Sequence, residues 1–116
     1  HYQKKYPQSK LVRCIKGEIF DVAVDIREDS KTFAFWVGVK LSDSNHHQLY
    51  VPKGFAHGFF VISDFAEVSY KCSEFYYPKY DSGIIWNDKT ININWNVNNP
   101  ILSEKDKSLP FLKKNN

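Results

Sequence analysis

The sequence of 116 residues contains no methionine and only two cysteines, five glycines and five prolines. Cys14 and Cys72 lie in separate apolar segments without the close spacing of a zinc or redox site, so we expect two buried free thiols. No apolar run approaches the roughly 20 residues that span a bilayer, and no charged-then-apolar signal segment opens the chain. These absences indicate a cytoplasmic protein with no membrane partner.

A strong charge of either sign is also lacking. The formal net charge is +3, and apart from two short Lys-Lys pairs near the ends the basic residues are interspersed with acidic ones. A nucleic-acid-binding protein gathers its basic residues into a patch, so we expect no nucleic-acid partner. A mildly positive cleft for a small anionic ligand stays compatible with this balance, because local fields depend on nearby groups more than on net charge.

Aromatic residues are plentiful, with seven Tyr, nine Phe and three Trp, and their burial favours a folded chain. Apolar, β-branched runs recur about every ten residues, which is typical of a sandwich or barrel. Val22 and Val24 alternate with Asp21 and Asp25, which predicts a strand with one wetter face. We expect strands within residues 10–27, with a turn at Gly17 and Glu18, and at 32–41, 48–52, 59–62, 66–72, 84–86 and 91–95.

Helical periodicity does not persist beyond one turn, and only Ser103 to Asp106 resembles the start of a short helix. After Trp95 the composition turns to Asn, Pro, Lys and Ser, so we expect an irregular or short-helical tail. The sequence shows no internal repeat and no second domain. We therefore expect one all-β domain over residues 1–116.

The segment from Pro52 to Gly58 is the most informative, because it places His57 between two glycines directly after an expected strand. There the imidazole can project from a loop into a barrel mouth, the alternative being a histidine satisfied within a turn. The Pro-x-Gly-x-x-His spacing resembles the signature of cupin-type jelly rolls, which are β-sandwich barrels of antiparallel strands. His46 and His47 suggest a metal, but the His-x-His and Glu motif of metal-binding cupins is absent, so we expect none.

Several segments in order resemble the dTDP-4-dehydrorhamnose 3,5-epimerase family: His1-Tyr2-Gln3, Gly17 to Arg27, Pro52 to Phe59, and Trp86-Asn87-Asp88. The resemblance extends from His1 to Leu112 with small gaps. It implies a cofactor-free isomerase of deoxysugar (rhamnose-type) biosynthesis. Its substrate would be a dTDP-linked 4-keto-6-deoxy sugar, with protons removed and returned at the two carbons beside the ketone. The product of dTDP-4-dehydro-6-deoxyglucose would be dTDP-4-dehydrorhamnose.

Four catalytic residues follow from the resemblance. His1 matches the base, a role that suits imidazole because its ordinary pKa of about 6.5 lets it take and release a proton near neutrality. Asp106 matches the carboxylate that orients this base. Lys10 matches an ammonium that stabilises the enolate, and Tyr70 matches the acid that protonates the opposite face of the sugar.

The same resemblance implies five substrate contacts: Lys10, His57, Tyr76, Asp81 and Lys105. His57 would contact the sugar or phosphate and Tyr76 would stack on the thymine, as flat rings do on base faces. Lys105 would supply a further basic contact. Asp81 stands where the family often has Glu.

The family pattern also includes strands and an arginine before His1 that this sequence lacks, so we expect a processing boundary at His1 and incomplete activity of this chain alone. The resemblance further implies a homodimer. Two alternatives remain open. One is an epimerase acting at a single carbon, C3 or C5, and the other is a non-catalytic cupin that binds a sugar or nucleotide.

Overall fold

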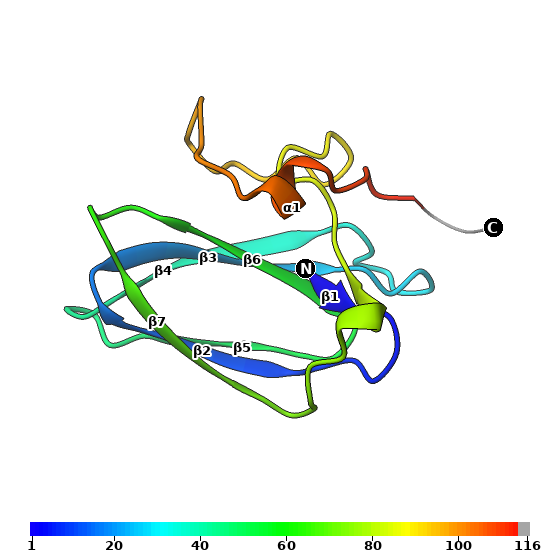
Figure 1. Cartoon of the computed structure of the whole chain (residues 1–116), viewed down its shortest axis with the longest axis horizontal. Coiled ribbons are helices and arrows are strands. Elements are labelled where there is room, and N and C mark those ends of the chain that lie inside the picture. The colour runs from blue at the N-terminus through cyan, green and yellow to red at the C-terminus, as the bar shows by residue number, and fades with distance from the viewer. Residues whose placement is uncertain (114–116) are drawn as a thin grey trace.

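The computed structural model describes residues 1–113, which consist of short strands and the loops between them (Figure 1). The strands are β1 (Tyr2–Gln3), β2 (Lys10–Lys16), β3 (Glu18–Asp25), β4 (Trp36–Ser42), β5 (Gln48–Val51), β6 (Phe55–Val61), β7 (Glu67–Cys72) and β8 (Asp81–Ser82). A 3₁₀ turn covers Pro78–Tyr80 and the helix α1 covers Glu104–Lys107. Among the described residues, no helix is long and apolar enough to cross a membrane.

Two antiparallel sheets form the body of the fold, one in the order β5-β2-β7 and the other in the order β4-β3-β6. They face each other as two layers, and the short β1-β8 pair lies at one end (Figure 1). This arrangement confirms the all-β fold expected from the strand spacing and the jelly roll implied by the cupin-type signature. Strand β6 pairs with β3 along its whole length, from Phe55 to Val61.

The space between the sheets is filled by a cluster of buried side chains, namely Val12, Cys14, Ile19, Ala23, Leu41 and Val51. Asp21 and Asp25 lie in the same strand as Ile19 and Ala23 and are equally buried, at 0% and 1% exposure. The prediction of a wetter face on this strand is therefore wrong, because Asp21 pairs with the buried His57 and Asp25 accepts hydrogen bonds from Arg27, which covers it.

The opposite face of β3 is covered by the segment after β8. Val22 and Val24 pack with Ile91, Ile93 and Trp95, and Figure 1 shows this segment lying over the β4-β3-β6 layer, away from the other sheet. Both faces of β3 are thus enclosed, which explains why the strand is buried along most of its length.

The strands expected at 84–86 and 91–95 do not form. Asp88 bonds the backbone nitrogens of Ile91 and Leu112 through its two carboxylate oxygens, at 2.9 and 2.6 Å. Asn92 and Asn96 have φ angles of 55° and 56°, a left-handed conformation that asparagine tolerates and that breaks a strand. The irregular tail and the short helix expected near residue 103 are confirmed.

Three further predictions need correction. Strand β4 begins at Trp36 and not at residue 32, because Ala34 has a φ of 69° and residues 31–34 turn the chain. Strand β6 begins at Phe55 and not at residue 59, so His57 lies inside a strand and not on a loop. Cys14 is buried as expected, but Cys72 is exposed because β7 forms the edge of its sheet.

Candidate active site

His1 is held at the edge of β6 by backbone hydrogen bonds. Its nitrogen donates to the carbonyl of His57 at 2.8 Å, and its carbonyl accepts from the nitrogen of His57 at 2.9 Å. This reciprocal pairing is the pattern of an antiparallel ladder. Tyr2 and Gln3 then pair with β8. These backbone hydrogen bonds fix the position from which the His1 imidazole projects.

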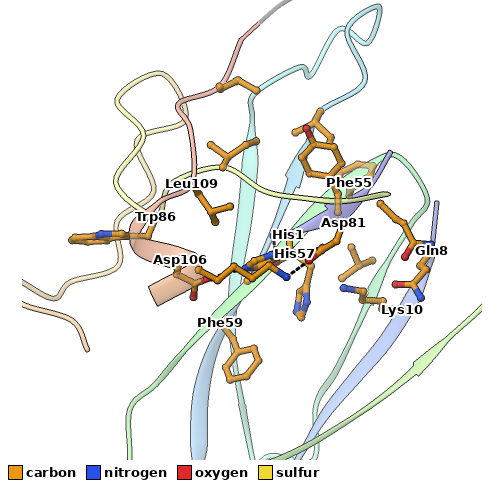
Figure 2. Close-up of a pocket in the computed structure, with 18 of the residues that line it drawn as sticks. His1, Gln8, Lys10, Phe55, His57, Phe59, Asp81, Trp86, Asp106 and Leu109 are labelled. Atoms are coloured by element: carbon orange, nitrogen blue, oxygen red, sulfur yellow. Dashed lines mark hydrogen bonds and ion pairs between the residues drawn. The ribbon is translucent and has the colours of Figure 1, made fainter. Parts of the chain in front are cut away.

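The imidazole of His1 has a carboxylate near each ring nitrogen. Nε2 lies 2.6 Å from Oδ1 of Asp106, and Nδ1 lies 3.9 Å from Oδ1 of Asp81. Figure 2 shows the ring flanked by these two residues. The hydroxyl of Ser103 accepts from the backbone nitrogen of Asp106 at 3.1 Å, an N-cap that starts α1 and places the carboxylate.

A second histidine–carboxylate pair lies directly beside the first. Nε2 of His57 is 2.6 Å from Oδ1 of Asp21, and both side chains are buried, at 6% and 0% exposure. Within the described residues, Oδ2 of Asp21 has no hydrogen-bond partner. Sequence reasoning missed Asp21, and its one signal was a carboxylate inside an otherwise apolar run.

Lys10 and Tyr70 lie on the neighbouring strands β2 and β7. The register pairs Val12 with Tyr70 and Lys10 with Cys72, so Lys10 and Tyr70 share the face that carries the buried Val12. The Lys10 ammonium lies 5.7 Å from the centre of the Tyr70 ring, a distance at which a cation and a ring attract each other.

Tyr76, Asp81 and Lys105 meet at the mouth of the site. The Tyr76 hydroxyl lies 3.4 Å from Oδ2 of Asp81, and the Lys105 ammonium contacts the same oxygen. The hydrogen bond from Lys105 to Asp81 raises the pKa of the Lys105 ammonium. The buried Gln3 supports the loop that carries Tyr76, because its amide bonds the backbone of Phe75 at 3.0 Å and of Tyr77 at 2.9 Å.

All eight residues expected from the sequence line one cavity of about 1160 Å³: His1, Lys10, His57, Tyr70, Tyr76, Asp81, Lys105 and Asp106. Figure 2 labels five of them, His1, Lys10, His57, Asp81 and Asp106. Phe55, Phe59 and Trp86 supply apolar parts of the lining. Asp21 does not line the cavity and supports His57 from behind. The cavity therefore combines an oriented imidazole, an ammonium and a phenol. These groups can catalyse proton transfer at a carbon beside a carbonyl group.

The histidines and carboxylates described in this cavity are not arranged as metal ligands. Among residues 1–113, no set of three or more His, Cys, Asp or Glu side chains is placed to hold a metal ion. His46 and His47 are exposed on the turn that precedes β5, and neither lines the cavity.

An antiparallel jelly roll whose cavity holds a carboxylate-oriented histidine defines a cupin-type protein with an acid–base site. Comparison with known proteins makes this assignment specific. The family model for dTDP-4-dehydrorhamnose 3,5-epimerase matches residues 1–114. The chain belongs to this family.

Individual relatives agree with the family model. The chain is 60% identical to the dTDP-4-dehydrorhamnose 3,5-epimerase of Shigella flexneri over 91% of this chain and 59% of the relative. The crystal structure of the epimerase from Bacillus anthracis with TDP and PPi bound superposes with a TM-score of 0.93 at 51% identity, over 96% of this chain and 64% of that one. The crystal structure of the Legionella pneumophila enzyme in complex with dTDP-4-keto-L-rhamnose superposes with a TM-score of 0.92 at 45% identity, over 95% of this chain and 59% of that one. This chain thus spans less than two thirds of these relatives.

Proposed function

We propose that the protein is an isomerase that inverts C3 and C5 of dTDP-4-dehydro-6-deoxyglucose to give dTDP-4-dehydrorhamnose, in rhamnose-type deoxysugar biosynthesis. One observation carries the proposal: the His1–Asp106 pair opens on the same cavity as Lys10 and Tyr70. The bound TDP and dTDP-4-keto-L-rhamnose of the two crystal structures support a dTDP-linked sugar as the ligand.

His1 acts as the base in this proposal. Asp106 occupies Nε2, which leaves Nδ1 to take the proton from C5, a carbon acidified by the neighbouring ketone. The electron pair of the broken C–H bond moves to the C4 oxygen and forms an enolate. The carboxylate of Asp106 stabilises the imidazolium that results.

Lys10 and Tyr70 complete the exchange. The Lys10 ammonium stabilises the negative charge on the enolate oxygen, and the Tyr70 phenol gives its proton to C5 from the opposite face, which inverts the carbon. The phenolate then regains a proton from water and the imidazolium of His1 releases one. A second round at C3 follows the same steps, and no cofactor enters either round.

Binding of the nucleotide sugar is assigned to His57 and Tyr76 together with Lys10, while Asp81 and Lys105 border the cavity beside His1. Tyr76 is 59% exposed, so its ring face is available for stacking on thymine. His57 has one ring nitrogen on Asp21, and its other nitrogen is left for a ligand oxygen.

Deuterium incorporation tests the proposal. The native-length protein is incubated with dTDP-4-dehydro-6-deoxyglucose in D₂O, and NMR follows deuterium at C3 and C5. We expect label and inversion at both carbons, and loss of both in His1→Asn. Unchanged exchange in His1→Asn would overturn the assignment of the base. Label at one carbon alone would instead identify a single-carbon epimerase, whose base, carboxylate and lysine would be the same.

A non-catalytic binding protein is the second candidate, since an aromatic-lined cavity can hold a nucleotide sugar without turnover. Calorimetric measurement of dTDP binding, compared with the exchange of sugar protons, distinguishes the enzyme from the binding protein. Binding without any exchange of sugar protons would favour the binding protein.

The proposal includes a homodimer. Strands β4 and β5 are edges of their sheets within the described chain, and Val37 and Tyr50 on them are 59% and 60% exposed, as expected of surfaces that pair with a second copy. Light scattering measures the mass of the protein in solution, and we expect twice the mass of one chain. A cytoplasmic location is also proposed, because Cys14 and Cys72 are both free thiols, as is usual in a reducing compartment.

A further inference from the structure

Lys105 and Asp81 form an ion pair directly beside the His1–Asp106 pair. Lys105 precedes Asp106 in α1, so one turn of helix brings an ammonium to Asp81 and a carboxylate to His1. The side chain of Asp81 is only 12% exposed. A carboxylate so enclosed needs a partner, and Lys105 is the cation that contacts it.

Asp81 presents its two oxygens to different neighbours. Oδ2 accepts from Lys105 and lies 3.4 Å from the Tyr76 hydroxyl, while Oδ1 lies 3.9 Å from Nδ1 of His1. A distance of 3.9 Å is too long for a hydrogen bond, yet a small rotation of either side chain would close it. Asp81 is therefore a potential second acceptor for the His1 ring.

That second bond would oppose catalysis. A histidine whose Nδ1 carries a proton held by a carboxylate cannot use this nitrogen as a base, and two carboxylates on one ring favour the imidazolium. The reaction proposed above needs Nδ1 unprotonated, with the single proton of the neutral ring on Nε2 toward Asp106.

We propose that Lys105 is a positioning residue that holds Asp81 away from Nδ1 of His1 and so keeps this nitrogen available as the proton acceptor. The inference rests on the proposed function. It gives Lys105 and Asp81 a role through His1, different from the direct substrate contacts expected from the sequence.

Three other titratable residues of the cavity, Tyr76, His57 and Lys10, have different contacts. The Tyr76 hydroxyl donates to the same oxygen of Asp81 that Lys105 contacts. His57 is engaged with Asp21, while Lys10 lies against the Tyr70 ring on the wall formed by β2 and β7. Lys105 is thus the cation that contacts Asp81 among the described residues.

The test uses four variants of the native-length protein: Lys105→Gln, Asp81→Asn, the double variant, and Lys107→Gln as the matched control. Lys107 lies on the same helix, is similarly exposed and pairs with Glu104 at 3.0 Å, away from His1. For each variant kcat, KM and the affinity for dTDP are measured against pH.

We expect Lys105→Gln to lower kcat by about tenfold near neutrality and to move the acidic limb of the kcat profile up by about one pH unit. The affinity for dTDP should stay within about twofold, because no ligand contact is lost. Asp81→Asn should not show the upward shift of the acidic limb, and the double variant should recover most of the kcat lost in Lys105→Gln, since the competing carboxylate is gone. Lys107→Gln should change nothing.

Two results would overturn the inference. If Lys105→Gln and Asp81→Asn both weaken dTDP binding additively, the two residues are ligand contacts. If the double variant is as slow as Lys105→Gln, Asp81 is not the cause of the defect.

A spectroscopic readout separates this inference from the proposed function. Nitrogen-15 shifts of the His1 ring report which nitrogen carries the proton, whether or not the protein turns over. We expect the Nε2–H tautomer in the wild type and a gain of protonated Nδ1 in Lys105→Gln. Identical shifts in both would end the inference, while a wild type that exchanges no sugar protons would end only the proposed function.

Discussion

Asp21 and His57 face each other across strands β3 and β6, with Oδ1 and Nε2 2.6 Å apart and both side chains almost fully buried. The pair is diagonal in the register, because Asp21 lies opposite Phe59 and His57 opposite Ala23. A carboxylate in this position fixes the orientation of the His57 ring and leaves its other nitrogen toward the cavity. Asp21 on β3 thus orients a side chain of β6 that lines the cavity.

Asp21→Ala should be strongly destabilising, because it leaves the buried His57 nitrogen without an acceptor. We expect a loss of about 3 kcal/mol in the free energy of unfolding, measured by urea denaturation. Asp64→Asn, at an exposed turn, is the control and should cost less than about 0.5 kcal/mol. Equal stability of the two variants would contradict the importance of the pair.

Asp25 should make stability depend on pH. The hydrogen bond from Arg27 holds the pKa of this carboxyl well below its usual range, with further bonds from Ser30 and Thr32. A lowered pKa contributes stability above the unfolded value of about 4 and loses it as the pH falls toward the folded value.

Asp25→Asn should therefore be less stable than the wild type by about 2 kcal/mol at pH 7. The difference should shrink as the pH falls from about 4 to about 2. Urea denaturation of both proteins across this range checks it. A gap that is constant with pH would show that the charge of Asp25 is not what stabilises the fold.

Gly38→Ala should disturb the packing of Phe20. A Cβ at residue 38 would lie 2.2 Å from Cζ of Phe20, and this ring is wedged edge-on between Trp36 and Trp95. We expect a loss of about 1 to 3 kcal/mol by thermal unfolding. Phe20→Leu in the Gly38→Ala background should recover part of it.

Gly58→Ala is the matched control for Gly38→Ala. Its Cβ would meet only Trp95, at an ordinary 3.7 Å. If both alanine variants unfold at the same temperature, crowding against Phe20 is not the reason for the glycine at residue 38.

Tyr70→Phe should uncouple exchange from inversion. The phenylalanine ring keeps its place 5.7 Å from the Lys10 ammonium but has no proton to give. His1 should still remove and return protons on its own face, so NMR in D₂O should show label with retained configuration. Formation of the inverted product should fall by about 100-fold or more. Inverted product at the wild-type rate would exclude Tyr70 as the acid.

The two thiols should react very differently. Cys14 is buried at 5% exposure, and burial raises the pKa of its thiol, so a reagent that needs thiolate should reach it slowly. Cys72 is exposed. Thiol titration of the native protein should count one fast group, which Cys72→Ser removes, and a second only in denaturant. Two fast groups in the native state would contradict the buried position of Cys14.

Strand periodicity and motif order in the sequence were sufficient for the fold class, and for strands such as β7, whose residues Val68, Tyr70 and Cys72 alternate with polar ones. The residues that line the cavity were also predictable, because the family resemblance implies a role for His1, Asp106 and Lys10 one by one. These features depend on residue type and on spacing along the chain, which a sequence contains directly.

Tertiary structure decided which polar groups meet. Asp21 is a partner of His57, Asp81 lies near the second nitrogen of His1, and Lys105 contacts Asp81, yet these pairs are separated by 36, 80 and 24 positions in the chain. It also decided that β3 is enclosed on both faces, because the segment from residue 84 onward folds over it. Sheet register and long-range packing create such neighbours, and local propensity contains neither.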